Sequence, residues 1–206
     1  VYVNGEFFSK NEASISVFDR GFLFSDSVYE VTAVLDGNLV DWKEHFARLI
    51  RSLRHLNLEN NFQEKDFYHI QKKLINENQL KEGLCYVQVT RGVAERDFNF
   101  AKKSLLPTVV IFTQEKQILK NAASKVGVKI ITVPDDRWRR RDIKTTQLLA
   151  QSLAKTHAVQ EGVDDSLLVQ GGFINEGSSS NVFIFQDERI ITPSLSNDIL
   201  GGITRS

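Results

Sequence analysis

The first half of the chain alternates between two hydrophobic periods. From residue 28 to 35 apolar side chains alternate with polar ones, which predicts a strand that turns at Asp36-Gly37. After Asp41 the apolar residues recur every three or four positions, which predicts a helix with Asp41 as N-cap and Glu44 completing a capping box. The elements expected in this half are a hairpin at Asn4-Gly5, strands at 28–35, 84–91 and 108–113, and helices at 42–56 and 67–75.

The second half mixes short strands with one helix. A β-branched run predicts a strand at 126–133, and a helix is expected after Lys144, capped by Thr145 or Thr146 and ending near Gly162. Four further strands are expected near 166–170, 172–174, 182–185 and 189–192, with tight turns at Gly171-Gly172 and Asp187-Glu188. The pattern is α/β in class, with an α+β first part, and a polar stretch at 114–123 divides it into expected domains at 1–114 and 120–206.

Composition and charge exclude several classes of protein. The 26 basic and 26 acidic residues cancel, so no overall field attracts nucleic acid, and the basic run 137–141 reads as a solvated connection between flanking aspartates. A single cysteine, Cys85, excludes an internal disulfide and fits a reducing compartment such as the cytoplasm. No apolar run is long enough to span a membrane. The four histidines lack paired ligand spacing, so no metal is expected.

Lys144 stands at the junction between the strand expected at 126–133 and the helix that follows. A lysine at such a junction can be partly desolvated, which favours its neutral amine, and a neutral amine can form a Schiff base. A solvated lysine at a helix start is the commoner case, and spacing alone does not decide between the two.

A second stretch bears on that choice. Asn175 to Asn181 reads Asn-Glu-Gly-Ser-Ser-Ser-Asn, which predicts a turn of small residues between two strands. One carboxylate followed by a glycine and three serines suits a ligand with a cationic ring nitrogen and an anionic tail. Together with Ile143-Lys144 and Gln147-Leu148-Leu149, this stretch resembles the fold-type IV pyridoxal-phosphate enzymes, and among them the D-amino-acid aminotransferases.

The resemblance runs along nearly the whole chain, from Asn4 to Arg205. It implies two α/β domains with the cofactor in the cleft between them, and a homodimer. Members of the family continue for several elements past the match to Arg205, so we expect the second domain to be incomplete in the sequence given.

The resemblance also implies pyridoxal 5′-phosphate as cofactor and assigns roles around it. Lys144 would form the Schiff base and move a proton from the substrate α-carbon, while Glu176 would pair with the pyridine nitrogen. Arg48 would bind the phosphate, as would Ile203 and Thr204 at the start of an expected helix. Without the resemblance, Arg48 reads as a solvated arginine and Glu176 as an exposed turn residue. The implied cofactor-binding residues are Arg48, Lys144, Glu176, Ser179, Ser180, Ile203 and Thr204.

Three residues are implied to contact the substrate. Tyr29 and Val31 share one face of the first long strand, although a core tyrosine with one hydrogen bond is the usual alternative. Arg96 follows the strand 84–91 and would bind the substrate carboxylate across the dimer interface. D-amino-acid aminotransferases carry Arg-x-His here, whereas Phe98 takes the place of the histidine in this chain and removes one donor.

The implied function is transfer of an amino group from a small amino acid, expected to be a D-amino acid such as D-alanine, to a 2-oxo acid. Two alternatives share the fold, namely aminodeoxychorismate lyase and branched-chain aminotransferase. A third is a protein that binds pyridoxal phosphate without turnover. The stretch 28–31 and Arg96 favour the D-amino-acid type, and Phe98 leaves the substrate range open.

Overall fold

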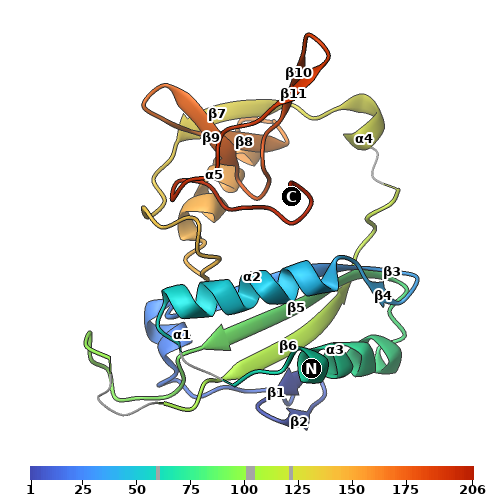
Figure 1. Ribbon diagram of the computed structural model, residues 1–206, viewed down its shortest axis with the longest axis vertical. Helices are drawn as coiled ribbons and strands as arrows, with labels where there is room; N and C mark the ends of the chain where they lie inside the picture. The colour runs from blue at the N-terminus through green and yellow to red at the C-terminus, as the bar shows by residue number, and fades with distance from the viewer. Residues whose placement is uncertain (59–60, 101–104, 121–122) are drawn as a thin grey trace. The chain divides into compact units, whose positions relative to one another are not determined.

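The computed structural model describes residues 1–58, 61–100, 105–120 and 123–206. The chain divides into two compact units, coloured from blue to red along the chain in Figure 1. The first unit contains Val1–Lys120 and Lys144–Thr146, and the second contains Asn121–Ile143 and Gln147–Ser206. Lys144 therefore belongs by its contacts to the first unit, while its neighbours along the chain belong to the second.

The first unit is built on a six-stranded sheet with the strand order β2-β1-β6-β5-β3-β4. Its strands are β1 (Tyr2–Val3), β2 (Glu6–Phe7), β3 (Ser27–Leu35), β4 (Asn38–Leu39), β5 (Glu82–Thr90) and β6 (Val109–Glu115). Its helices are α1 (Arg20–Phe24), α2 (Trp42–His55) and α3 (Glu64–Glu77). The hairpin, strands and two long helices predicted for this part are all confirmed.

The capping box predicted for α2 is wrong. Asp41 is the N-cap, but its side chain makes no capping hydrogen bond, and its backbone is left-handed with φ of 50°. The usual N-cap backbone is extended, and that conformation brings the side-chain oxygen to the first turn. The left-handed backbone of Asp41 explains why the predicted bond is missing.

The two faces of this sheet carry different side chains. On β3 the residues Val28, Glu30, Thr32 and Val34 are buried, while Tyr29 and its neighbours on the other face are partly exposed. Helix α2 packs against β3, α3 packs against β6, and the two helices contact each other, as Figure 1 shows for α2 along the sheet. On the opposite face the rings of Tyr29, Tyr86 and Phe112 form a stacked row.

The second unit contains two small sheets and two helices. A three-stranded sheet has the order β7-β8-β9, with β7 parallel to β8 and β9 antiparallel to it, and β10 and β11 form a separate hairpin. Its elements are α4 (Ala123–Val126), β7 (Ile130–Pro134), α5 (Leu149–Gln160), β8 (Asp165–Gln170), β9 (Phe173–Gly177), β10 (Ile184–Gln186) and β11 (Arg189–Ile191). The tight turns predicted at Gly171-Gly172 and Asp187-Glu188 are confirmed by positive φ angles in all four residues.

Two predictions for this unit are wrong in detail. The strand expected at 126–133 begins only at Ile130, because the turn of α4 ends at Val126 and Gly127 follows with φ of +79°. Helix α5 ends near Gly162 as predicted, but its apolar positions at Leu149 and Leu153 do not face the core of this unit. Leu149 and Leu153 are 73% and 61% exposed, and the buried residues of α5 are Ala154 and Ala158.

The described residues contain neither a candidate membrane span nor a candidate metal cluster. None of the helices that the structure describes combines the length and the apolar character needed to cross a membrane. Within the same ranges, no group of three or more His, Cys, Asp or Glu side chains could hold a metal ion.

Candidate active site

The segment that carries Lys144 runs beside the start of β3. Tyr29 N–H donates to the Lys144 carbonyl at 3.0 Å, and Val28 and Thr145 form an antiparallel bridge. The hydroxyls of Thr146 and Ser27 lie 2.5 Å apart. The prediction that Thr145 or Thr146 caps α5 is therefore wrong. Residues 144–146 are extended against β3, and α5 begins later, at Leu149, without a side-chain cap. The backbone of Lys144 is therefore fixed by the sheet.

The amine of Lys144 lies beside the phenol of Tyr29. Nζ is 3.4 Å from Tyr29 Oη and 4.4 Å from the centre of its ring. Burial raises the pKa of the Tyr29 phenol, and the charge of Glu30 raises it further. The phenol therefore stays protonated at neutral pH, and its oxygen can accept a hydrogen bond from the amine. The structure brings together these two residues, which were predicted on separate grounds.

Behind Tyr29 lies a buried cluster that we call the Glu30 centre: Glu30, Arg48 and His45. Arg48 donates from Nε to Glu30 Oε1 at 2.7 Å and from Nη2 to Glu30 Oε2 at 2.8 Å, and His45 Nδ1 lies 2.8 Å from the same Oε2. Burial alone would raise the pKa of Glu30, but the bonds from Arg48 and His45 outweigh it and hold the pKa below its ordinary value. The solvated reading of Arg48 is therefore wrong, since its side chain is 8% exposed. Its phosphate-binding role stays a prediction.

A second buried cluster lies in the other unit, and we call it the Glu176 centre: Glu176, Arg137 and Asp135. Glu176 sits in β9, so its assignment to an exposed turn is wrong. Its carboxylate accepts hydrogen bonds from Arg137 Nη1, from Asn181 Nδ2 at 3.1 Å and from Leu200 N–H at 3.3 Å. Burial raises the pKa of Glu176, and the charge of Arg137 opposes that rise without cancelling it.

Asp135 holds the guanidinium of Arg137 from the other side. Arg137 donates from Nε to Asp135 Oδ1 at 2.8 Å and from Nη2 to Asp135 Oδ2 at 2.7 Å, a bidentate pair. Arg141 and Asn175 also reach Asp135, at 3.4 and 2.9 Å. The prediction of a solvated connection at 137–141 is therefore wrong for Arg137 and Arg141, whose side chains are 6% and 3% exposed. The available sequence signal was a dense basic run beside aspartates in a chain of zero net charge.

The serines and the last residues of the chain were also predicted to contact the cofactor. Ser179 and Ser180 are exposed, and among the described residues neither hydroxyl makes a hydrogen bond, whereas Ser178 is buried and bonds to Asp165. Ile203 and Thr204 lie in a turn that Ser206 N–H closes on the Ile203 carbonyl at 3.1 Å. The helix expected to start there is not formed in the described chain.

Asn181 ties the segment before this turn to Glu176. Its Nδ2 donates to Glu176 Oε2 and to the Leu200 carbonyl at 2.9 Å, and its Oδ1 accepts from Gly202 N–H at 3.1 Å. A Cβ on Gly202 would collide with that same Oδ1, so any other residue there would force the Asn181 side chain to shift. Sequence reasoning missed Asn181, although it closes the serine motif.

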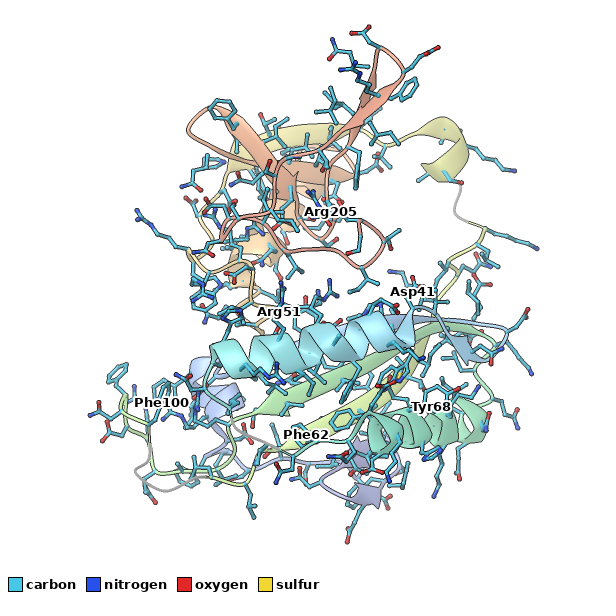
Figure 2. All side chains as sticks on the ribbon, in the orientation of Figure 1. Asp41, Arg51, Phe62, Tyr68, Phe100 and Arg205 are labelled. Carbon is cyan, nitrogen blue, oxygen red and sulfur yellow. The ribbon has the colours of Figure 1, made fainter. Side chains whose placement is uncertain are left out.

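Arg96 lies on an exposed segment after β5, in the first unit. Its guanidinium is 5.5 Å from the ring centre of Phe24 and 5.6 Å from that of Phe98, the residue in place of the expected histidine. Phe98 is 80% exposed. Phe100, labelled in Figure 2, lies nearby on the same segment with the Arg91 guanidinium 3.8 Å from its ring centre. Val31 lies on the Tyr29 face of β3, opposite Tyr86.

The donor and acceptor groups of these residues fit pyridoxal phosphate. A carboxylate offers about four acceptor positions, and the three donors on Glu176 leave roughly one for the N–H of a protonated pyridine ring. A primary amine, at Lys144, lies beside a phenol that can orient it. A buried guanidinium, at Arg48, can add charge to a phosphate site. Each group needed for the aldehyde, the ring nitrogen and the phosphate is therefore present in the chain.

Comparison with known proteins agrees with this set of groups. The family described as Amino-transferase class IV matches residues 27–206. A D-alanine aminotransferase of Staphylococcus aureus is 38% identical over 205 residues, which cover all of this chain and 72% of that protein, and one of Bacillus licheniformis is 35% identical over the same length.

Solved structures show the same fold. The branched-chain amino acid aminotransferase of Escherichia coli superposes with a TM-score of 0.90 at 20% identity, covering 98% of this chain and 70% of that one. The structure of a putative 4-amino-4-deoxychorismate lyase of Legionella pneumophila superposes with a TM-score of 0.82 at 24% identity, covering 95% of this chain and 72% of that one. At these identities the two structures establish the fold alone. The family match, and relatives that align along all of this chain, show that the chain belongs to the class IV aminotransferases and has the fold of the fold-type IV enzymes.

Proposed function

We propose that this aminotransferase moves an amino group from a small D-amino acid, such as D-alanine, to a 2-oxo acid with the help of pyridoxal phosphate. One observation carries the proposal: the Lys144 amine is held by β3 beside the Tyr29 phenol, in a chain 38% identical along its length to a D-alanine aminotransferase. The likeness to the lyase and to the branched-chain enzyme lies below 25% identity and favours neither alternative.

Each reactive part of the cofactor has a proposed partner in the chain. Lys144 takes the aldehyde, Glu176 the ring nitrogen, and Arg48 the phosphate. The proposed contacts around the anionic tail are completed by Ser179, Ser180, Ile203 and Thr204. The exposed hydroxyls of Ser179 and Ser180 and the turn at 203–204 support this assignment, because hydroxyl and backbone N–H groups bind phosphate well.

When bound, pyridoxal phosphate supplies an aldehyde that condenses with an amine and a ring that accepts the electron pair left on the substrate α-carbon. Lys144 Nζ is proposed to take the proton from that carbon and to pass it to the cofactor during the same half-reaction. Tyr29 Oη keeps the amine in place for both transfers. Glu176 holds the proton on the ring nitrogen, because a buried carboxylate favours a cationic neighbour.

The substrate is proposed to meet Tyr29, Val31 and Arg96. Tyr29 and Val31 share the sheet face that Lys144 approaches, and the charge of Arg96 suits the substrate carboxylate. The two rings beside Arg96 offer no hydrogen-bond donor, so the guanidinium would act there without the donor that the family histidine provides.

We propose a cytoplasmic homodimer in which Arg96 serves the active site of the partner subunit. Lys144→Ala and Arg96→Ala would each be nearly inactive alone. A mixed dimer of the two would place both changes in one site and leave the other intact, so activity returns to about half of wild type per mixed dimer. Absence of recovery after demonstrated subunit exchange would rule out the cross-subunit role.

The half-reaction tests the proposed function directly. Protein loaded with pyridoxal phosphate is mixed with D-alanine or L-alanine, and the visible spectrum and the 2-oxo acid are followed. We expect stoichiometric conversion with D-alanine and at least about tenfold slower conversion with L-alanine. Binding of the cofactor without conversion of any donor would support the alternative that the protein binds pyridoxal phosphate but catalyses no reaction. Faster conversion of branched L-amino acids would support the branched-chain alternative.

A further inference from the structure

The Glu176 centre contains more charge than the proposed function uses. Two carboxylates and two guanidiniums, those of Asp135, Glu176, Arg137 and Arg141, are almost excluded from water. Burying four ionised groups is costly unless each is paired and hydrogen-bonded. The way in which they are paired therefore carries information about what the site needs.

The guanidinium of Arg137 is shared unequally. Asp135 accepts a bidentate pair of hydrogen bonds from the Nε–Nη2 edge of the guanidinium, at 2.8 and 2.7 Å. Glu176 receives only the Nη1 group, on one of its two oxygens. Its other oxygen faces neutral donors, the Asn181 amide and the Leu200 N–H. Glu176 thus has one charged donor where a bidentate arginine would give two.

Asp135 is fixed so that it keeps this edge. Its Oδ2 also receives Asn175 Nδ2 at 2.9 Å, and Arg141 donates to the Asp135 carbonyl at 3.3 Å. Arg141 is itself held by Asp198 at 2.8 Å and by Gln170 at 2.7 Å. The carboxylate of Asp135 has no exposed surface, and hydrogen bonds from Arg137 and Asn175 keep its pKa below the ordinary value despite burial.

We propose that Asp135 and Arg137 are positioning residues for Glu176: Asp135 holds the guanidinium edge away from Glu176, which leaves that carboxylate with one charged donor and an acceptor position for a cationic ring N–H. The inference rests on the proposed function, in which Glu176 meets the ring nitrogen. If Arg137 gave its edge to Glu176, two charged hydrogen bonds would fill the acceptor positions and lower the affinity of the carboxylate for a further proton. In the observed arrangement burial keeps the proton affinity of Glu176 high, because one charged donor does not cancel that effect.

Two substitutions should shift the pKa of the Glu176 carboxyl in opposite directions. Arg137→Gln removes the one charged donor and should raise the pKa of the Glu176 carboxyl by about 1–3. Asp135→Asn removes a neighbouring negative charge and releases the guanidinium edge, so it should lower that pKa. Arg139→Gln is the matched control, since Arg139 lies in the same basic run but is exposed. It should leave the pKa of Glu176 unchanged.

The experiment is a pH titration of the full chain, dialysed free of cofactor and labelled with 13C at the glutamate carboxyls, with Glu176→Gln to assign the signal. Opposite shifts in Arg137→Gln and Asp135→Asn support the proposal, because general damage to the fold would move both variants the same way. Shifts of the same sign, or none, overturn it. If Arg137→Gln does not fold, Asp135→Asn decides alone: a lower pKa supports the proposal, and an equal or higher one overturns it. The titration needs no turnover, so failure of the half-reaction with D-alanine would refute the proposed function without changing this result.

Discussion

Two buried glutamates of this chain, Glu30 and Glu176, have similar partners but carboxyl pKa values shifted in opposite directions. Glu30 and Glu176 are 3% and 5% exposed in their side chains, and each is paired with one arginine. Yet the pKa of Glu30 lies below its ordinary value of 4.5, and that of Glu176 lies above it. Burial acts in the same direction on both, so the difference comes from their hydrogen bonds and from the charges beside them, which include Lys144 for Glu30 and Asp135 for Glu176.

The geometry of the arginine explains the difference. Arg48 gives Nε and Nη2 to Glu30, and His45 adds a third contact. Arg137 gives that same edge to Asp135 and leaves Glu176 a single group. Counting salt bridges would treat the two centres as equal. The orientation of the guanidinium contributes to which carboxylate has a lowered pKa and stays ionised, and which has a raised pKa and binds a proton more readily.

The largest effect is expected at Lys144, whose amine lies 3.4 Å from the Tyr29 phenol and is proposed to carry the cofactor. Lys144→Ala should lower turnover by about a thousandfold or more, because it removes the amine that bonds covalently to the cofactor. Rates with D-alanine measure the loss, and borohydride reduction followed by peptide mapping should place the pyridoxyl group on Lys144 of the wild type. Lys65→Ala, an exposed lysine on α3, is the control. A label on another lysine would disprove the assignment.

Next in size is Glu176→Gln, which tests whether this centre serves the chemistry. A neutral amide cannot stabilise a protonated ring nitrogen as a carboxylate does, so turnover should fall by about a hundredfold while the cofactor is retained. The measurements are the rate with D-alanine and the cofactor content after gel filtration. Glu188→Gln, in the exposed β10–β11 turn, should behave like wild type. Unchanged turnover in Glu176→Gln would mean that Glu176 is only structural.

Arg48→Ala tests the other centre and should affect binding more than chemistry. Loss of a charge-assisted hydrogen bond to phosphate costs about 1.5–3 kcal/mol, or roughly ten- to a hundredfold in cofactor affinity. Titration of cofactor-free protein with pyridoxal phosphate gives the affinity, and Arg54→Ala on the same helix is the exposed control. Equal affinity in Arg48→Ala and wild type would exclude Arg48 as the phosphate ligand.

The smallest effect is a difference in how stability depends on pH. The folded pKa of Glu30 is lowered, so its stabilising contribution is present above about pH 4.5 and is lost as the pH falls through the folded value. The folded pKa of Glu176 is raised, so its contribution is present below about pH 4.5 and is lost as the pH rises through the folded value. Urea unfolding across pH 3–7 should therefore show a flatter acid side in Glu30→Gln and a flatter neutral side in Glu176→Gln, relative to wild type. The same change of slope in both variants would contradict the comparison.

Local patterns predicted most of the fold. The alternation at 28–35 and the helical spacing after Asp41 gave β3 and α2 nearly to the residue, because both periods follow from backbone geometry. The segment 144–146 could not be foreseen in this way. Its bonds to Ser27 and Tyr29 join residues more than a hundred positions apart, and a hydroxyl at the start of a helical pattern looks the same whether it caps the helix or pairs with a strand.

The sequence predicted which residues belong to the candidate site, but not which of them form hydrogen bonds with one another. The motif around Glu176 and the position of Lys144 pointed to the chemistry. The sequence did not show that Arg48 would bind Glu30, or that Arg137 would be buried between Asp135 and Glu176 and bind both. A charged side chain is expected to be exposed unless it is paired, and the sequence does not show which pairs form. Arg137 pairs both with Asp135, two positions away, and with Glu176, 39 positions away.

The most direct test of the account is to measure both carboxyl groups in one sample of wild-type protein. The full chain, labelled with 13C at the glutamate carboxyls and free of cofactor, is titrated from pH 2.5 to 8, with Glu30→Gln and Glu176→Gln to assign the two signals. The account predicts that Glu30 titrates below 4.5 and Glu176 above it. The same midpoint for both, or the reverse order, would contradict the claim that the orientation of the arginine sets the charge of its carboxylate.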